Sequence, residues 1–348
     1  MRILFTGNFD PEYNRTRVII SGLKSLGVEI NIFRFPKKKK PDRKKLLDAI
    51  EKTDWIFLPS FTHTDLPFIR NISLKPIIFD PLISRYLSKV FDYKSVWRFS
   101  PRAYKNYLKD SRALKRADLI LADTLSHKNY FTEKFNVPSE KIRVAPIGVI
   151  TNDFFPIKVK GGDRNKIIVG FYGSFIPLHG IDVIINTAEI LKAHKHIKFR
   201  LIGNGILFSK MQKMAEKKFL QNIDFVGWKP YSELNEEINN FDIALGIFGQ
   251  SKKANMVIPN KLFHYAACEK VIISRKSDAI TEIFDHDQNI SLCEPNPHGL
   301  ASAILAIGNI SERTRIAKKG RELILKDYNQ KKIAENILQF IKDYSKGI

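Results

Sequence analysis

Two lysines lie at a predicted strand-to-helix junction, where they could bind an anion. The apolar run at residues 241–248 predicts a buried parallel strand, and a polar loop containing Lys253 follows it. Pro259 then opens a predicted amphipathic helix, with Asn260 and Lys261 in its first turn. The free N–H groups of that turn favour an anion, whereas the helix dipole disfavours cations there. The two lysines therefore indicate a bound anion between them, and a solvated loop with ordinary surface lysines is the alternative.

Glycine turns follow several other predicted strands. In an open parallel sheet, ligands bind beyond the carboxyl ends of the strands. Glycine lets the backbone approach a phosphate there, although such turns also need glycine for steric reasons alone. The stretch TGNFDPE after the first strand contains no G-x-G-x-x-G, which disfavours a dinucleotide site and hydride transfer. The carboxyl-end rule places four segments along one edge of a second domain, at residues 173–180, 203–205, 227–229 and 249–261.

A carboxylate stands at the end of a predicted strand in the first half. Asp80 follows the apolar run at residues 76–79 and precedes Pro81. At this position it could orient or deprotonate a hydroxyl or stabilise positive charge, and an ordinary Asp-Pro turn is the alternative. The loop after the first strand supplies four candidate contacts for the same substrate, Asn8, Asp10, Tyr13 and Arg15.

Short apolar runs alternate with helical patterns throughout the chain. This alternation predicts an α/β fold with two doubly wound parallel sheets. A break falls at residues 151–166, where Pro156, Gly161 and Gly162 interrupt a charged stretch. One amphipathic helix is predicted at residues 330–344. The predicted strands are 2–6, 29–33, 55–58, 76–79, 119–122 and 142–145 in the first half, and 167–172, 198–202, 223–226, 241–247, 271–274 and 290–292 in the second.

Composition narrows the class of protein. A length of 348 residues with 44% apolar residues suffices for two cores of ordinary size. The two cysteines, Cys268 and Cys293, belong to no CxxC or Cys/His cluster, so structural disulfides and zinc are not expected. The N-terminal sequence MRILFTGNFD does not look like a signal peptide, and no apolar run approaches the roughly 20 residues that span a bilayer. A cytoplasmic location is the expectation.

The net charge is strongly positive. The chain has 58 Lys and Arg against 36 Asp and Glu, a net +22. From Arg85 to Arg116, ten basic residues stand against two acidic ones and are mixed with seven aromatics. This mixture suits an anionic membrane surface at the inner face of the cell membrane. Nucleic acid is the runner-up partner, although the sequence has no RNP, helix-turn-helix or zinc-finger pattern to support it. The remaining alternative is a solvated helix with no partner. A helix starting near Pro101 would carry four cations roughly on one face, Lys105, Lys109, Arg112 and Arg116.

Four segments together resemble one family of enzymes. IFGQSKKANMVIPNKLFHYAA, at residues 247–267, resembles the sugar-nucleotide-binding segment of family-4 glycosyltransferases (glycosyl transferases group 1) of the GT-B fold. Residues 115–155 are similar to the end of that family's first domain and the entry to its second. Residues 169–182 are similar to its phosphate loop, and residues 199–205 to the strand and glycine turn that follow. The segments occur in the family's order and extend over nearly the whole chain.

This resemblance implies a fold, a division into domains and a reaction. Two Rossmann-like domains would face a cleft, with the acceptor on residues 1–155, the nucleotide sugar on residues 156–329, and a helix at residues 330–348 crossing back to the first domain. The implied activity is of the hexosyltransferase type, from a nucleotide-diphosphate-sugar donor to a hydroxyl of a lipid-linked or polysaccharide acceptor, with retention and without metal or cofactor. Another GT-B-fold enzyme, such as a sugar-nucleotide epimerase, and a non-catalytic binding protein derived from the family remain alternatives.

The resemblance also suggests a role for individual residues. Asp80 lies where many members carry a strand-end histidine that faces the reacting sugar, and it is the candidate catalytic residue. This sequence departs from the family at the donor site, where Ser174 replaces an arginine, His179 a lysine, and Met256 and His264 two glutamates. The candidate diphosphate contacts are Lys253, Lys261, Asn260, Ser174 and His179, and the candidate nucleoside and sugar contacts are Gly173, Asn204, Trp228, Lys229 and His264.

Overall fold

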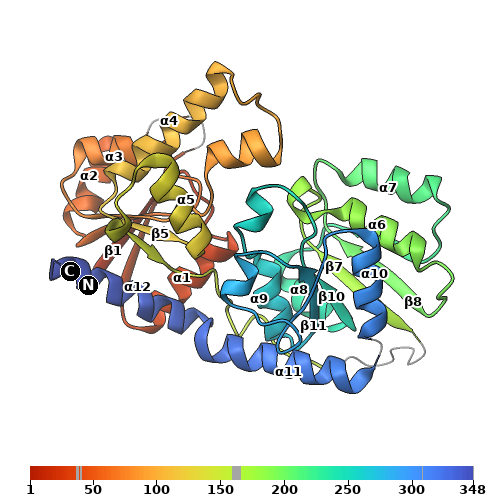
Figure 1. Ribbon diagram of the computed structural model, residues 1–348. Helices are drawn as coiled ribbons and strands as arrows, with labels where there is room; N and C mark the ends of the chain where they lie inside the picture. The colour runs from red at the N-terminus through yellow and green to blue at the C-terminus, as the bar shows by residue number, and fades with distance from the viewer. Residues whose placement is uncertain (37–38, 40, 159–165, 308, 348) are drawn as a thin grey trace. The chain divides into compact units, whose positions relative to one another are not determined.

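The computed structural model describes residues 1–36, 39, 41–158, 166–307 and 309–347 (Figure 1). The chain divides into two compact units, Met1–Ile150 with Asn329–Ile348, and Thr151–Tyr328. The second unit begins a few residues before the boundary expected at residue 155, because Phe154 packs edge-to-face on Tyr231 and the Phe155 N–H donates to Asn235. The interdomain glycines Gly161 and Gly162 lie outside the described residues.

The first unit is a parallel six-stranded sheet with helices. Its strands pair in the order β2-β1-β3-β4-β5-β6. The residues of β3 and β5 are all buried, which explains their uninterrupted apolar sequences. The strands are β1 (Arg2–Gly7), β2 (Glu29–Arg34), β3 (Trp55–Leu58), β4 (Ile77–Phe79), β5 (Leu119–Ala122) and β6 (Ile142–Val144). The helices are α1 (Asn14–Ser25), α2 (Arg43–Glu51), α3 (Leu66–Ile72), the π-helical η1 (Leu87–Asp92), α4 (Pro101–Arg116), α5 (Leu125–Phe135), the 3₁₀ turn η2 (Ser139–Lys141) and α12 (Gln330–Ser345).

The last helix, α12, belongs to the first unit and lies beside α1 (Figure 1). A Cβ at Gly22 of α1 would lie 2.0 Å from the Gln330 carbonyl oxygen and 2.8 Å from the Ala334 Cβ. Glycine therefore permits this close approach. The apolar face of α12 is buried through Ile333, Ile337 and Ile341, so the predicted amphipathic helix packs as its pattern requires.

The second unit is a parallel six-stranded sheet of the same kind. Its strands pair in the order β12-β11-β10-β7-β8-β9. They are β7 (Ile167–Tyr172), β8 (Ile197–Ile202), β9 (Ile223–Gly227), β10 (Ile243–Leu245), β11 (Val271–Arg275) and β12 (Ser291–Cys293). The helices are α6 (Ile181–Ile190), α7 (Phe208–Lys217), α8 (Leu234–Asn239), α9 (Asn260–Ala267), α10 (Pro297–Ala306) and α11 (Ile310–Asp327), and the 3₁₀ turns are η3 (Pro177–His179), η4 (Tyr231–Glu233), η5 (Lys253–Asn255) and η6 (Ile280–Glu282).

The predicted α/β class with two doubly wound parallel sheets is confirmed. The helix after Lys253 differs from its prediction in two respects. Pro259 is the N-cap residue and not the first helical residue, and α9 is not amphipathic, because all its residues after Asn260 are buried. The reason is that α9 packs against both β11 and α11, so its polar residues Lys261 and His264 lie inside the unit.

The described helices include none with both the length and the apolarity to cross a membrane. Cys268 and Cys293 are both free. Burial raises the pKa of both thiols to about 12, so neither is a thiolate at neutral pH.

Candidate functional site

Two glycine turns touch each other at the carboxyl ends of β7 and β8. Gly173 directly follows β7 and has a φ of +146°, and Gly203 directly follows β8 and has a φ of +136°. A Cβ at Gly203 would lie 1.9 Å from the Gly173 carbonyl oxygen. Glycine is required at both positions, since L side chains rarely adopt this backbone conformation. The two turns therefore present backbone at the strand ends, where the sequence predicts the donor site.

Lys261 lies in the space that the missing side chain of Gly173 leaves. A Cβ at Gly173 would lie 2.8 Å from the Lys261 Nζ, which stands 3.9 Å from the centre of the Phe171 ring. The side chain is 3% exposed, and its Nζ has no hydrogen-bond partner within the described part of the chain. Burial holds the pKa of Lys261 well below its ordinary value. A buried amine without a partner is costly, and its place beside a glycine turn suits an anion.

His179 and Ser174 border the same turn. The His179 Nδ1 donates a hydrogen bond to the Ser174 carbonyl oxygen, which fixes the tautomer of the buried imidazole. Burial, and secondarily the charge of Lys261, holds the pKa of His179 well below its ordinary value. The imidazole is therefore neutral at physiological pH, and it does not supply the charge of the lysine that it replaces. The Ser174 side chain is exposed.

The remaining predicted diphosphate contacts lie on the loop and helix after β10. Lys253 is buried in η5, and its charge also contributes to the lowered pKa of His179. Asn260 is the first residue of α9 and is half-buried. Pro259 caps this helix without a side-chain hydrogen bond, so the cap side chain occupies none of the N–H groups of the first turn. Lys253, the first turn of α9 and the amine of Lys261 thus suit an anion, and the neutral imidazole of His179 lies beside them.

A pocket of about 180 Å³ opens beside this site. It brings together five of the predicted donor contacts from three consecutive strand ends. Trp228 lines the pocket and is 71% exposed. The lining residues are Tyr172, Gly173, Ser174, Ile202, Gly203, Asn204, Trp228, Lys229 and Leu234. A larger groove of about 960 Å³ shares only Lys229 with this pocket and lies mainly along α8 and the amino ends of β7 and β10, away from the predicted site.

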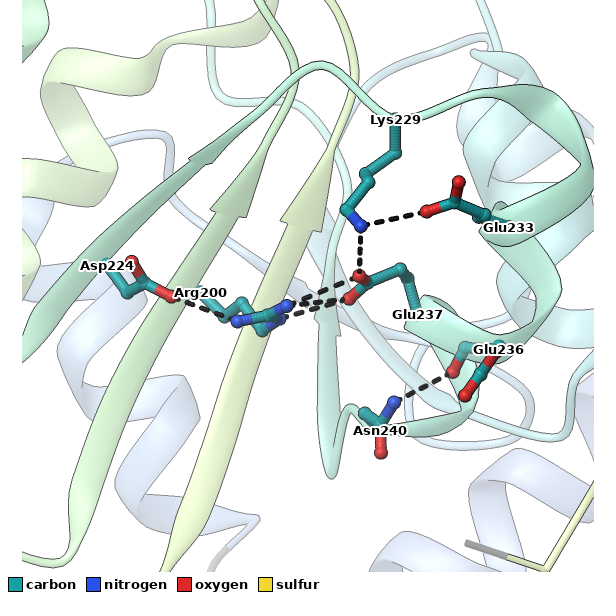
Figure 2. Close-up of polar contacts among 7 residues, drawn as sticks. All are labelled: Arg200, Asp224, Lys229, Glu233, Glu236, Glu237 and Asn240. Atoms are coloured by element: carbon teal, nitrogen blue, oxygen red, sulfur yellow. Dashed lines mark hydrogen bonds and ion pairs between the residues drawn. The ribbon is translucent and has the colours of Figure 1, made fainter.

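Lys229 is held by a network of carboxylates (Figure 2). Its Nζ lies 2.8 Å from Glu233 and 3.5 Å from Glu237, two residues one turn apart. The Glu233 carboxylate raises the pKa of Lys229. Arg200 extends the network, because its guanidinium binds Glu237 at 3.0 Å and Asp224 at 2.9 Å. The wall of the pocket at Lys229 is thereby tied to β8, β9 and α8.

His264 does not line the described pocket. Its ring is buried and stacks on Phe154 with the ring centres 3.8 Å apart, and its Nδ1 shares a hydrogen bond with the Tyr172 hydroxyl. Burial lowers the pKa of His264 to about 3, so the ring is neutral at physiological pH. These contacts are those of an interior histidine, and a contact with a ribose stays a prediction.

Asp80 and Arg15 form a buried ion pair in the first unit. The Arg15 Nε lies 2.8 and 2.7 Å from the two Asp80 carboxylate oxygens, and its Nη1 donates to the Ala145 carbonyl oxygen at 2.9 Å. Both side chains are fully buried. Burial raises the pKa of Asp80, and the Arg15 charge opposes that rise. The expectation that Arg15 belongs to an open polar loop is wrong, because Arg15 lies in the buried first turn of α1.

The other candidate acceptor contacts are more exposed. The side chains of Asn8 and Asp10 are exposed, and the Asn8 N–H donates to Asp65 at 2.7 Å. Tyr13 is half-buried and packs edge-to-face on Phe61, with ring centres 5.2 Å apart. These three residues are placed where a ligand of the first unit could reach them.

Sequence reasoning missed a second acidic residue at the same sheet edge. Asp123 directly follows β5, is hydrogen-bonded to the buried His127, and adds to the raised pKa of Asp80. The signal was available, because Asp123 follows an apolar run just as Asp80 does. In the portions of the chain that are described, no group of three His, Cys, Asp or Glu side chains is arranged to hold a metal ion.

Comparisons with known proteins match this chain to glycosyltransferases. Residues 186–339 match the family model described as "Glycosyl transferase-like". The chain is 28% identical over 154 residues to an uncharacterized glycosyltransferase of Methanocaldococcus jannaschii, covering 44% of this chain and 41% of that protein. It is 24% identical over 216 residues to the putative colanic acid biosynthesis glycosyltransferase WcaL of Escherichia coli, covering 60% and 53%. The matches therefore span about half the length of these relatives.

Solved structures share the fold over the whole chain. The crystal structure of Anabaena HepE in complex with UDP and glucose matches with a TM-score of 0.75 at 14% identity, covering 98% of this chain and 99% of that one. Sucrose-phosphate synthase from Thermosynechococcus elongatus matches with a TM-score of 0.79 at 13% identity, covering both chains completely. The fold is accordingly the two-domain α/β fold of GT-B glycosyltransferases.

Proposed function

We propose that this protein is a glycosyltransferase that moves a sugar from a nucleotide-diphosphate donor to a hydroxyl of a lipid-linked or polysaccharide acceptor, with retention of the anomeric configuration. The observation that carries the proposal is Lys261, a buried amine without a hydrogen-bond partner in the described chain that faces the glycine turn after β7. The names of the matched relatives, which include putative colanic acid biosynthesis glycosyltransferases, support the same class of reaction.

The second unit would bind the donor. Its diphosphate accepts hydrogen bonds from Lys261 and from the first turn of α9, while Lys253 adds positive charge. The exposed Trp228 ring supplies a face on which a nucleobase can stack beside the 180 Å³ pocket. HepE, which has the same fold, was crystallised with UDP and glucose, so a UDP-sugar is the first donor to test.

The transfer breaks the bond between the anomeric carbon and the diphosphate, whose oxygen keeps the electron pair. The acceptor hydroxyl oxygen bonds to that carbon, and its proton is released to solvent. Lys261 and the α9 turn stabilise the leaving diphosphate, and this is the role that a metal ion would otherwise fill. Asp80 is our candidate for the carboxylate that assists the reaction, and Arg15 fixes its position through the ion pair.

We further propose that the surface from Arg85 to Arg116 contacts an anionic membrane. Trp97 and Phe99 are 71% and 69% exposed and pack against each other, and the Arg98 guanidinium lies 4.9 Å from the centre of the Phe99 ring. Lys94, Arg102 and Lys105, which are close to this aromatic pair in the sequence, are exposed as well. Aromatic rings with flanking cations suit the interface of an anionic bilayer, at the cytoplasmic face if the acceptor is lipid-linked.

Co-sedimentation with vesicles tests the membrane contact. Binding should require anionic lipid and weaken as salt rises, because each basic residue near the surface contributes about 1 kcal/mol through screened charge. Lys105→Glu with Arg112→Glu should abolish it, whereas Lys210→Glu with Lys213→Glu, a matched reversal on exposed α7 residues of the second unit, should leave it intact. Equal binding to neutral and anionic vesicles would contradict the proposal.

A thermal-shift screen against UDP-glucose, GDP-mannose and other nucleotide sugars tests the donor site, followed by an assay for labelled product with a lipid or glycan acceptor. A donor that stabilises the protein and is consumed only with acceptor supports a glycosyltransferase. Turnover of the donor without acceptor indicates an epimerase, and the absence of any nucleotide binding indicates a non-catalytic protein.

A further inference from the structure

Among the residues that the structure describes, no acidic group is paired with Lys261 to balance its charge. The amine stands over the Phe171 ring, with Gly173 on one side. The titratable group that borders it is His179 from η3, a neutral imidazole that lies at the same Gly173 position, and the charge of Lys253 from η5 acts on that imidazole. No carboxylate of the described residues forms a salt bridge or hydrogen bond with it. The described residues of this unit therefore supply no counter-ion for a charged Lys261.

An ammonium in such surroundings loses its hydration and gains the face of the Phe171 ring, but no hydrogen-bond acceptor among the described residues. Burial disfavours the charged form of a lysine, which can instead release its proton. The direction of the pKa shift of Lys261 agrees with this physical expectation. A diphosphate placed at the Gly173 turn would bring negative charge and oxygen acceptors to the same amine. The charged form of Lys261 would then be favoured over the neutral form.

We propose that Lys261 is an uncharged amine in the ligand-free protein and takes up one proton when the nucleotide diphosphate binds. The inference rests on the proposed donor site and adds to it a proton linkage. The proton comes from solvent, and no covalent bond changes. Donor affinity should consequently fall about tenfold for each unit of pH over the range in which the free amine is neutral and the bound one is charged.

Calorimetry with UDP-glucose measures this uptake, with GDP-mannose as the second probe. The sugar-linked diphosphate keeps a constant charge near neutral pH, so a binding heat that varies with the ionisation heat of the buffer reports protons taken up by the protein. Wild type should take up about one proton at about pH 8. Lys261→Arg, which stays charged, should take up none, whereas His179→Gln should still take one up, because the amine and not the imidazole receives it.

The outcomes separate this inference from the proposed function. Donor binding without proton uptake by wild type overturns the inference and leaves the donor site standing. Uptake that is lost in His179→Gln but kept in Lys261→Arg overturns it as well, since the imidazole would then be the group that titrates. If neither nucleotide sugar binds, the donor site itself is wrong.

A ligand-free measurement tests the neutral amine directly. Because the unfolded state protonates Lys261 up to about pH 10.4, a folded state that keeps it neutral loses stability as pH falls below that value. Lys261→Met should therefore raise the melting temperature at neutral pH, and its advantage should shrink as pH approaches 10. Lys270→Met is the matched control, because the half-buried Lys270 donates to the Asn239 carbonyl oxygen at 2.7 Å, and it should not stabilise. A Lys261→Met protein no more stable than wild type at any pH overturns the inference.

Discussion

Arg15 and Lys261 occupy corresponding places in the two units, but within the described residues only Arg15 has a carboxylate partner. Each is the second residue of a helix, α1 or α9, and each is buried. The helix dipole disfavours a cation at both places. In the first unit Asp80 offsets this through two contacts shorter than 3 Å, whereas Lys261 has no hydrogen-bond partner in the described residues of the second.

This difference suggests that Arg15 stabilises the fold, whereas Lys261 binds a ligand. In a buried ion pair each charge is balanced by the other. Removing one partner leaves the other charge buried and unpaired. A buried lysine without a counter-ion lowers the folding stability of its domain. Such a residue is expected at a binding site, where it raises the affinity for a ligand. Mutations at the two positions should consequently affect different measurements, stability in the first unit and donor binding in the second.

The largest effect is expected on breaking the ion pair. Asp80→Asn leaves the Arg15 guanidinium buried without its counter-ion, and about 3–5 kcal/mol of unfolding free energy should be lost in urea titrations. Where the variant still folds, kcat should fall far more than donor affinity if Asp80 also assists the reaction. Asp80→Leu combined with Arg15→Met should recover much of the stability but none of the activity. A loss below about 1 kcal/mol for Asp80→Asn would show that the pair is not a structural unit.

The second effect is expected in donor binding. Lys261→Ala removes a charge-assisted hydrogen bond, worth about 1.5–3 kcal/mol or about 10- to 150-fold in donor affinity, without destabilising the free protein by a comparable amount. Lys253→Ala should cost less, because Lys252 stands next to it and can replace part of its charge. Titration calorimetry or turnover at varied donor concentration measures both. Unchanged kinetics in Lys261→Ala would remove Lys261 from the donor site.

A smaller effect is expected from filling the space beside the amine. Gly173→Ala introduces a Cβ 2.8 Å from the Lys261 Nζ at a φ of +146°, so the amine must move and the backbone is strained. Donor affinity should fall about tenfold and stability by about 1–3 kcal/mol. Gly27→Ala is the matched control, because Gly27 has a φ of +76° but nothing within 4 Å of its Cβ position. It should cost stability alone, and equal donor affinities in the two variants would contradict the assignment.

The fold could be predicted from sequence because each strand carries its own signal. Runs such as WIFL and LILA are apolar throughout, which happens when both faces of a parallel strand are covered. The carboxyl-end rule then located Gly173, Lys261 and Asp80 without knowledge of contacts. The same rule would have found Asp123, had it been applied to every strand.

The burial of polar side chains could not be predicted in this way. The pattern NKLFHYAA has polar residues that suggest an exposed face, and its burial depends on α11 and on Phe154, both distant in sequence. Likewise, the pairing of Arg15 with Asp80 joins residues 65 positions apart. Such contacts are set by tertiary packing, which overrides the local pattern.

The smallest effect is expected at the wall of the pocket, where partly exposed charges are paired in a network. Glu237→Gln removes the carboxylate that binds both Arg200 and Lys229 (Figure 2). Stability should change little, because the partly exposed Arg200 and Lys229 keep Asp224 and Glu233 as partners. Donor affinity should shift by only about twofold as Lys229 loses one of its two carboxylates. Glu236→Gln is the matched control, since Glu236 is the preceding residue of α8 and its carboxylate lies outside the network in Figure 2. Measured by titration with UDP-glucose at low and high salt, the Glu237→Gln shift should fade as salt rises. A loss as large as that of Lys261→Ala would mean that Lys229, and not the buried amine, holds the diphosphate.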